Sequence, residues 1–153
     1  MIQLDYALSP SEISKVNEAN LIAATNTEID YYLFCGDVFF RIDDTRFDAA
    51  WGWVPVVDYA TQLYLIASEI REGETRYLEY TESEAAIRFR RIGDDVEVAA
   101  EYVSANAVVP LYELQVAAKD FIRRVFSDLM SRWPKLAGNP FFNERVKMVE
   151  ASK

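Results

Sequence analysis

Residues 85–103 carry the pattern that most restricts the fold of this chain. Apolar and charged side chains alternate over 85–92 and again over 96–103, and Gly93-Asp94-Asp95 joins the two runs. A period of two places successive side chains on opposite faces of a strand, and a short Gly/Asp segment is typical of a tight turn. The pattern therefore predicts a β-hairpin, and with it an antiparallel sheet.

The charges of this hairpin have a structural interpretation. Arg88 and Arg90 share the polar face of the first strand, and Glu97 and Glu101 share that of the second. Opposite charges that face each other across antiparallel strands contribute about 0.2–1 kcal/mol per pair. We interpret them as cross-strand ion pairs and not as a functional site.

Three segments have helical periodicity. The first follows Ser9-Pro10-Ser11-Glu12, where Ser9 and Glu12 have the spacing of a capping box and Pro10 suits the first turn. The second begins at Pro55, and Gly73 is placed as its C-terminal cap. The third and longest begins at Pro110 and ends at Trp133-Pro134.

Other segments are predicted to be strands. Residues 2–8 alternate apolar and polar side chains, and residues 76–80 form a short strand before the hairpin. Residues 28–34 and 37–42 are rich in β-branched and aromatic side chains, with Cys35-Gly36 between them. They are expected to form either one strand bent at Gly36 or two strands of a hairpin. A turn is expected at Asp43-Asp44-Thr45.

These elements predict an α+β fold. We expect a mostly antiparallel sheet with about three helices packed on one face, the longest being C-terminal. The 153 residues fit a single domain, 1–153. Phe141 and Phe142 are expected to dock on its body, and the polar tail from about residue 144 is expected to fray.

The residue types that most catalytic sites require are missing. The chain has no histidine and one cysteine, Cys35, so Ser-His and Cys-His nucleophiles, zinc ligation and disulfides within the chain are excluded. The spacing of the five glycines excludes phosphate-binding glycine loops. We therefore predict a protein without catalytic activity, cofactor or metal, in which Cys35 is a buried apolar residue.

The candidate binding residues are carboxylates and two tryptophans. Trp51 and Trp53 flank a glycine just before the second helix, an arrangement that fits either a gap-filling pair or an aromatic anchor for a basic partner. Two acidic clusters accompany them, Asp43, Asp44 and Asp48 in one and Glu79, Glu82 and Glu84 in the other. As an alternative, such carboxylates could serve a metal-binding protein or a hydrolase.

The charge of the chain narrows the class of partner. With 25 acidic and 16 basic residues the formal charge is −9. A negative field repels nucleic acid and anionic membranes and attracts basic proteins. No signal peptide and no membrane-spanning run is recognised, so we expect a cytoplasmic protein.

The overall pattern resembles a family class. Gly36-Asp37, the Trp51-Gly52-Trp53-Val54-Pro55 entry to a helix, the late hairpin and the long C-terminal helix resemble small acidic immunity-type proteins of bacterial toxin/immunity systems, such as contact-dependent inhibition or polymorphic toxin systems. That resemblance implies an inhibitor that binds a cognate toxin domain, often a basic nuclease, and it assigns no individual residue. The alternative is a structural or regulatory subunit that self-associates, for example as a homodimer.

Overall fold

The strands form two antiparallel sheets instead of one. The computed structural model describes residues 1–151. In the first sheet, β2 (Cys35–Ile42) is central and pairs with β1 (Ile2–Leu8) along one edge. Its other edge is shared by β3 (Thr45–Arg46) and β4 (Ala49–Pro55).

The second sheet is a meander of sequential strands. Its order is β5 (Thr75–Glu79), β6 (Ala86–Ile92), β7 (Asp95–Ala100) and β8 (Ala107–Pro110). The β6–β7 pair is the hairpin that the sequence predicts, with Ile92 opposite Asp95 beside the turn.

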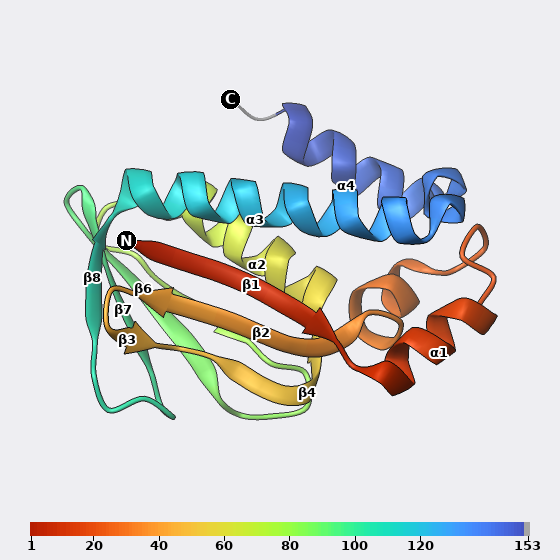
Figure 1. Ribbon diagram of the computed structural model, residues 1–153. Coiled ribbons are helices and arrows are strands. Elements are labelled where there is room, and N and C mark those ends of the chain that lie inside the picture. Colours follow the sequence, from red (N-terminus) through yellow and green to blue (C-terminus); the bar gives the residue numbers. More distant parts are fainter. Residues whose placement is uncertain (152–153) are drawn as a thin grey trace.

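Helices cover one side of the sheets. The long α3 (Leu111–Arg132) lies across them with α2 (Val56–Glu69) beside it, and α4 (Pro140–Ala151) packs on α3 (Figure 1). A 3₁₀ turn, η2 (Pro134–Gly138), joins α3 to α4, while α1 (Pro10–Glu18) follows β1 at one end of the molecule. The predicted α+β class, antiparallel strands and long C-terminal helix are confirmed.

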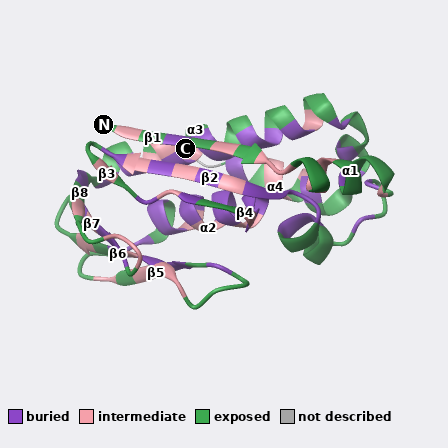
Figure 2. Cartoon of the chain, turned by 60° about the horizontal axis from the view of Figure 1, so that its bottom comes forward, coloured by how far each residue is buried: buried purple, intermediate pink, exposed green. Residues whose placement is uncertain are grey.

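The core lies between the helices and the sheets. Buried positions follow α2 and the middle of β2, and exposed positions follow the outer turns of α1 (Figure 2). Phe40 of β2 and Phe89 of β6 are both fully buried, and their rings stack with centroids 6.3 Å apart. This contact joins the two sheets through one core. No helix within residues 1–151 combines the length and apolarity needed to cross a bilayer.

The predicted strand at 28–34 is wrong. Residues Glu28–Tyr32 form η1, a short π-helical segment, and β2 starts only at Cys35. A capping box precedes η1. Thr25 Oγ1 accepts the Glu28 N–H (3.2 Å), and Glu28 Oε1 accepts the Thr25 N–H (3.1 Å). These reciprocal bonds favour helical geometry over the extended conformation suggested by the aromatic composition.

Two predicted helix caps are also wrong. Ser9 makes no side-chain capping bond to α1, because its hydroxyl donates to the Gly52 carbonyl (2.7 Å), and Glu12 pairs with Lys15. Gly73 lies beyond the end of α2, in the turn that leads to β5, with a φ of +76°. Its N–H donates to the Arg91 carbonyl at 3.0 Å, across to the end of β6.

The expected frayed tail is helical through residue 151. Arg145 of α4 makes a double hydrogen bond with the buried Asp30 carboxylate (2.6 and 2.8 Å), which ties α4 to η1. Phe142 docks in the core as predicted, whereas Phe141 is exposed. The last two residues of the predicted tail lie outside the described residues.

A buried asparagine joins distant segments of the chain. Asn139 is fully buried, and its amide donates to the carbonyls of Leu21 and Ala24, each at 2.8 Å. Its Oδ1 accepts the Phe142 N–H at 3.0 Å, at the start of α4. One side chain therefore holds the loop after α1 against the α3–α4 connection.

Candidate protein-binding surface

A bulge in β4 displays the two tryptophans. Val38 pairs with Ala49 and Gly36 pairs with Val54, so β4 advances five residues (49 to 54) where β2 advances two (36 to 38). The three additional residues lie out of register with β2. Trp51 belongs to this bulge.

Gly52 anchors the bulge through both of its backbone polar groups. Its N–H donates to Asp37 Oδ1 (2.8 Å), and its carbonyl accepts the Ser9 hydroxyl (2.7 Å). Its φ of +80° lies in the left-handed region that favours glycine. The bulge therefore has a defined conformation although it is out of register with β2.

The tryptophan rings form a stacked pair that joins the two sheets. Trp51 and Trp53 stack with centroids 5.3 Å apart, and Trp51 makes edge contacts with Tyr80 (5.0 Å) and Tyr102 (5.2 Å). The two tyrosine hydroxyls are 2.8 Å apart, and that of Tyr102 donates to the Phe47 carbonyl. Trp51 remains 37% exposed and Trp53 is half-buried. The pair therefore packs on the protein and also contributes to its surface.

A groove of about 450 Å³ lies beside Trp53. It is formed by α1, η1, the start of β2 and the loop between β5 and β6, and its lining residues are Glu12, Lys15, Tyr31, Tyr32, Cys35, Trp53, Thr81 and Glu82. Tyr32 is 57% exposed. Aromatic rings and carboxylates thus share one concave surface, and we call this groove with the Trp51–Trp53 pair the Trp53 groove.

The charges of the Trp53 groove are only partly neutralised. Lys15 Nζ lies 2.8 Å from Glu12 Oε2 and donates to the Tyr32 carbonyl at 3.3 Å. Glu82 has no ion pair within the part of the chain that the structure describes, and Glu84 in the same loop is exposed. The loop therefore presents free negative charge at the rim.

Cys35 lines the groove in its protonated form. Its S–H donates to the Tyr31 carbonyl at 3.3 Å. Burial is the main cause that raises the pKa of the thiol to about 12, and the neighbouring Glu12 carboxylate adds to it. Both effects oppose formation of the thiolate, which is the nucleophilic form of cysteine.

The residues of the first acidic cluster, Asp43, Asp44 and Asp48, do not line the Trp53 groove. Asp43, beside Asp44 in the turn after Ile42, pairs with the amino terminus. This turn is far from the bulge in β4, which lies beside Gly36 at the other end of β2. Ile42 and Gly36 are six residues apart, which corresponds to roughly 20 Å at about 3.3 Å per residue. Asp48 is used within the fold, since it accepts the Phe40 N–H (2.9 Å) and pairs with Arg41 (3.2 Å).

The second acidic cluster is divided. Glu82 lines the Trp53 groove and Glu84 lies in the same loop. Glu79 ends β5 with an exposed side chain, and its backbone N–H and carbonyl both bond to the side chain of Gln62 on α2 (2.9 and 2.8 Å). The structure thus brings Trp51, Trp53 and Glu82 together and leaves Asp43 and Asp44 apart.

Sequence reasoning missed the contribution of η1 to the groove. Tyr31 and Tyr32 were expected in a strand, where alternate side chains point to opposite faces. The spacing of Thr25 and Glu28 is the signal that could have placed them on a helical turn. Helical geometry instead lets both rings line the same groove.

No group of three or more His, Cys, Asp or Glu side chains is arranged to hold a metal ion within residues 1–151. No protein-family model, curated protein or solved structure matches the chain. The function proposed below is based on the Trp53 groove and the charge of the molecule.

Proposed function

We propose that this chain is a non-catalytic, cytoplasmic inhibitor of the immunity type, which binds and neutralises a basic toxin domain. The observation that supports the proposal is the Trp53 groove, where a stacked tryptophan pair and exposed Tyr32 adjoin the free carboxylate of Glu82. Partly exposed aromatic anchors with charge beside them are typical of the residues that dominate binding energy at protein interfaces.

The electrostatics favour a basic partner. The net charge of −9 attracts positively charged proteins over a distance of about 8–10 Å at physiological salt. Glu82 places part of that charge at the groove, and the exposed Glu84 lies in the same loop. Charges at a rim mainly accelerate association, whereas buried aromatic anchors mainly slow dissociation.

The experiment uses the intact protein and a charge-matched control. Glu82→Lys with Glu84→Lys reverses the groove rim, and Asp43→Lys with Asp44→Lys makes the same change in net charge at the far end of β2. Wild type and both variants are each used as bait in lysate of the native cell. Any captured protein is then purified, its binding kinetics are measured, and its toxicity is compared with and without this chain. We expect a basic toxic protein that wild type neutralises, with association slowed at least tenfold by the groove variant and much less by the control.

Two outcomes would contradict the proposal. Equal slowing by both variants would place the interface outside the groove. A captured protein whose activity is unchanged by this chain would overturn the inhibitory function.

Self-association is the second candidate function. Met1, Tyr112 and Val116 are exposed and surround a shallow surface between β1 and α3. If this surface mediates a homodimer, sedimentation velocity will show a dimer that persists in high salt, and Tyr112→Lys will produce monomers. A monomer at all concentrations tested would exclude this candidate.

A further inference from the structure

The outer face of the second sheet holds a polar recess that is separate from the Trp53 groove. Register places Tyr77, Arg88 and Ala99 side by side on β5, β6 and β7. Two residues further along on the same face lie Ala86 on β6 and Glu101 just after β7. Because alternate residues of a strand share a face, these side chains point to the same side of the sheet.

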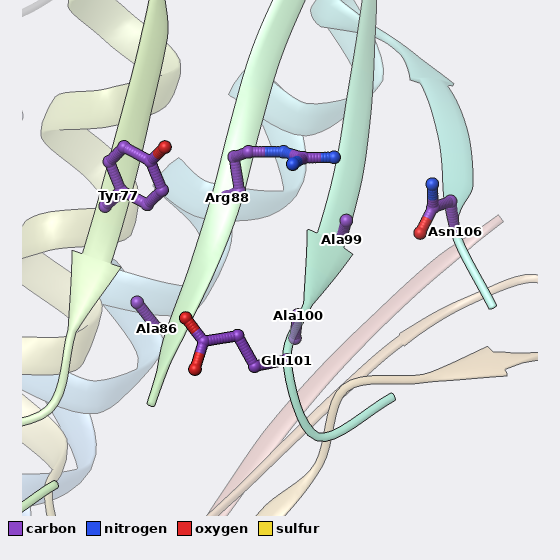
Figure 3. A pocket seen from close by; sticks show the side chains of 7 residues that line it. All are labelled: Tyr77, Ala86, Arg88, Ala99, Ala100, Glu101 and Asn106. Carbon is purple, nitrogen blue, oxygen red and sulfur yellow. The ribbon is translucent and has the colours of Figure 1, made fainter. Parts of the chain in front are cut away.

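Small side chains create the hollow. Ala86 and Ala99 occupy one diagonal of this arrangement, and Arg88 and Glu101 occupy the other. The methyl groups leave a space of about 340 Å³ between the longer side chains, and its lining residues are Tyr77, Ala86, Arg88, Ala99, Ala100, Glu101 and Asn106 (Figure 3). That volume accommodates a ligand of roughly amino-acid size.

Opposite charges border the recess without neutralising each other. Arg88 forms an ion pair with Glu97 at 3.6 Å, which confirms that part of the predicted cross-strand pairing, and its Nε–H is buried without a hydrogen-bond partner in the part of the chain that the structure describes. Glu101 makes no ion pair among the described residues, although it was expected to pair with an arginine of β6. In Figure 3 the Arg88 side chain extends toward β7, and the Glu101 carboxylate is turned toward Ala86.

Apolar and amide groups complete the recess. Tyr77 is 54% exposed and stands at the β5 side, and Asn106 stands at the β8 side. The recess therefore offers a cation, an anion, an amide and one aromatic ring around a floor of methyl groups.

We propose that this recess binds a small zwitterion, specifically a free α-amino acid with an apolar or aromatic side chain. The ligand carboxylate pairs with Arg88, its ammonium group pairs with Glu101, and its side chain lies against Tyr77. Diagonal positions on paired strands are about 7–8 Å apart, a span that the two charged ends of an amino acid can bridge with the protein side chains extended toward it. Charge-assisted hydrogen bonds at both ends make recognition depend on both ligand charges.

The first test is calorimetric titration of the full chain with leucine and phenylalanine. The same titrations use N-acetyl-leucine, which lacks the ammonium group, and leucinamide, which lacks the carboxylate. We expect saturable binding of both amino acids, and affinity for each blocked analogue at least tenfold weaker. Absence of binding up to millimolar ligand, or equal binding of the blocked analogues, would overturn the proposal.

Variants locate the binding at this recess. Arg88→Gln and Glu101→Gln each remove one charge partner, and Ala99→Leu fills the hollow while leaving both charges in place. Arg90→Gln is the control, because Arg90 lies on the same face of β6, two residues from Arg88 and outside the lining. We expect a loss of at least tenfold in affinity for the first three and little change for the control, with unchanged circular dichroism in all. Equal affinity of Ala99→Leu and wild type would place any binding elsewhere.

Discussion

At the scale of single residues, Gly52 is a position beside the Trp53 groove where the backbone conformation itself restricts the choice of side chain. It has a φ of +80°, and both of its backbone polar groups are bonded to side chains from β2 and from the start of α1. A side chain there has space, since an added Cβ would lie 3.6 Å from Ser9 Oγ. The cost of substitution is therefore conformational.

We predict that Gly52→Ala lowers the free energy of unfolding by about 1–2 kcal/mol, the cost of an L-residue in left-handed geometry. Urea unfolding followed by tryptophan fluorescence measures it. The control is Gly138→Ala, where the backbone is not left-handed and the added Cβ would meet Ile22 at an ordinary 3.4 Å. A loss for Gly138→Ala as large as that for Gly52→Ala would contradict this explanation.

Asp58, in the first turn of α2, provides a prediction of pH dependence. Burial is the main cause that raises its pKa to about 6, and the nearby Asp30 adds to it, while Gln62 and Arg145 oppose it. The folded protein therefore binds a proton at this site more readily than the unfolded chain does. Stability is expected to fall as pH rises from about 4 to about 6.

Asp58→Asn removes this titration and keeps an oxygen that can accept from Gln62. Because solvent partly screens this side chain, we expect a gain of only about 1 kcal/mol at pH 7 relative to wild type. Below pH 4 the difference is expected to vanish. Thermal unfolding from pH 4 to pH 8 tests this, and an equal pH slope in both proteins would contradict it.

At the scale of elements, a buried ion pair contributes to the docking of α4. Arg145 bonds to Asp30, which is 6% exposed, and also to Thr61 of α2 and Asn26 before η1. Removal of the arginine leaves a buried carboxylate without its partner. Arg145→Ala is expected to cost about 3 kcal/mol in unfolding free energy.

The matched control for this prediction is an exposed ion pair that also joins α4 to a neighbouring element. Arg123 of α3 bonds to Glu150 of α4 at 2.7 and 2.9 Å, with both side chains about half exposed. Arg123→Ala is expected to cost less than about 1 kcal/mol. Chemical denaturation of both variants measures the contrast, and similar losses would show that burial of Asp30 contributes little.

Elements with strong periodicity were predictable from the sequence. The α2 and α3 helices and the β6–β7 hairpin each repeat one hydrophobic period over many residues. Single residues that break the pattern therefore do not obscure it. The β4 strand was not predicted, because its register is broken by three additional residues around Gly52. Its pairing depends on contacts with Asp37 and Ser9, which are distant in sequence.

Local signatures were less reliable than periodicity. Ser9 and Glu12 have the same spacing as Thr25 and Glu28, yet only the second pair forms a capping box. The Ser9 hydroxyl is instead bonded to Gly52, a tertiary contact that the local pattern cannot reveal. For the candidate site, the sequence indicated Trp51, Trp53 and Glu82, but the groove itself needs α1 and η1, which only the fold brings beside them.

At the scale of the whole molecule, the two sheets are expected to unfold together. The stacked Phe40 and Phe89 and the Trp51–Tyr80 and Trp51–Tyr102 contacts join them. Phe89→Ala is expected to cost about 3–5 kcal/mol and to lower the midpoint observed by fluorescence and by far-UV circular dichroism equally. Separate midpoints for the two probes would indicate that the sheets unfold independently.

The buried Asn139 has a consequence for the order in which the chain acquires its structure during synthesis. The carbonyls that it holds, those of Leu21 and Ala24, leave the ribosome more than a hundred residues before their partner does. Residues 19–32, which include the tyrosines of the Trp53 groove, are therefore expected to take their final arrangement only after residues 139–145 have been translated and released from the exit tunnel. A partner that binds through the proposed groove is accordingly expected to meet a preformed surface only once residues 139–145 are in place.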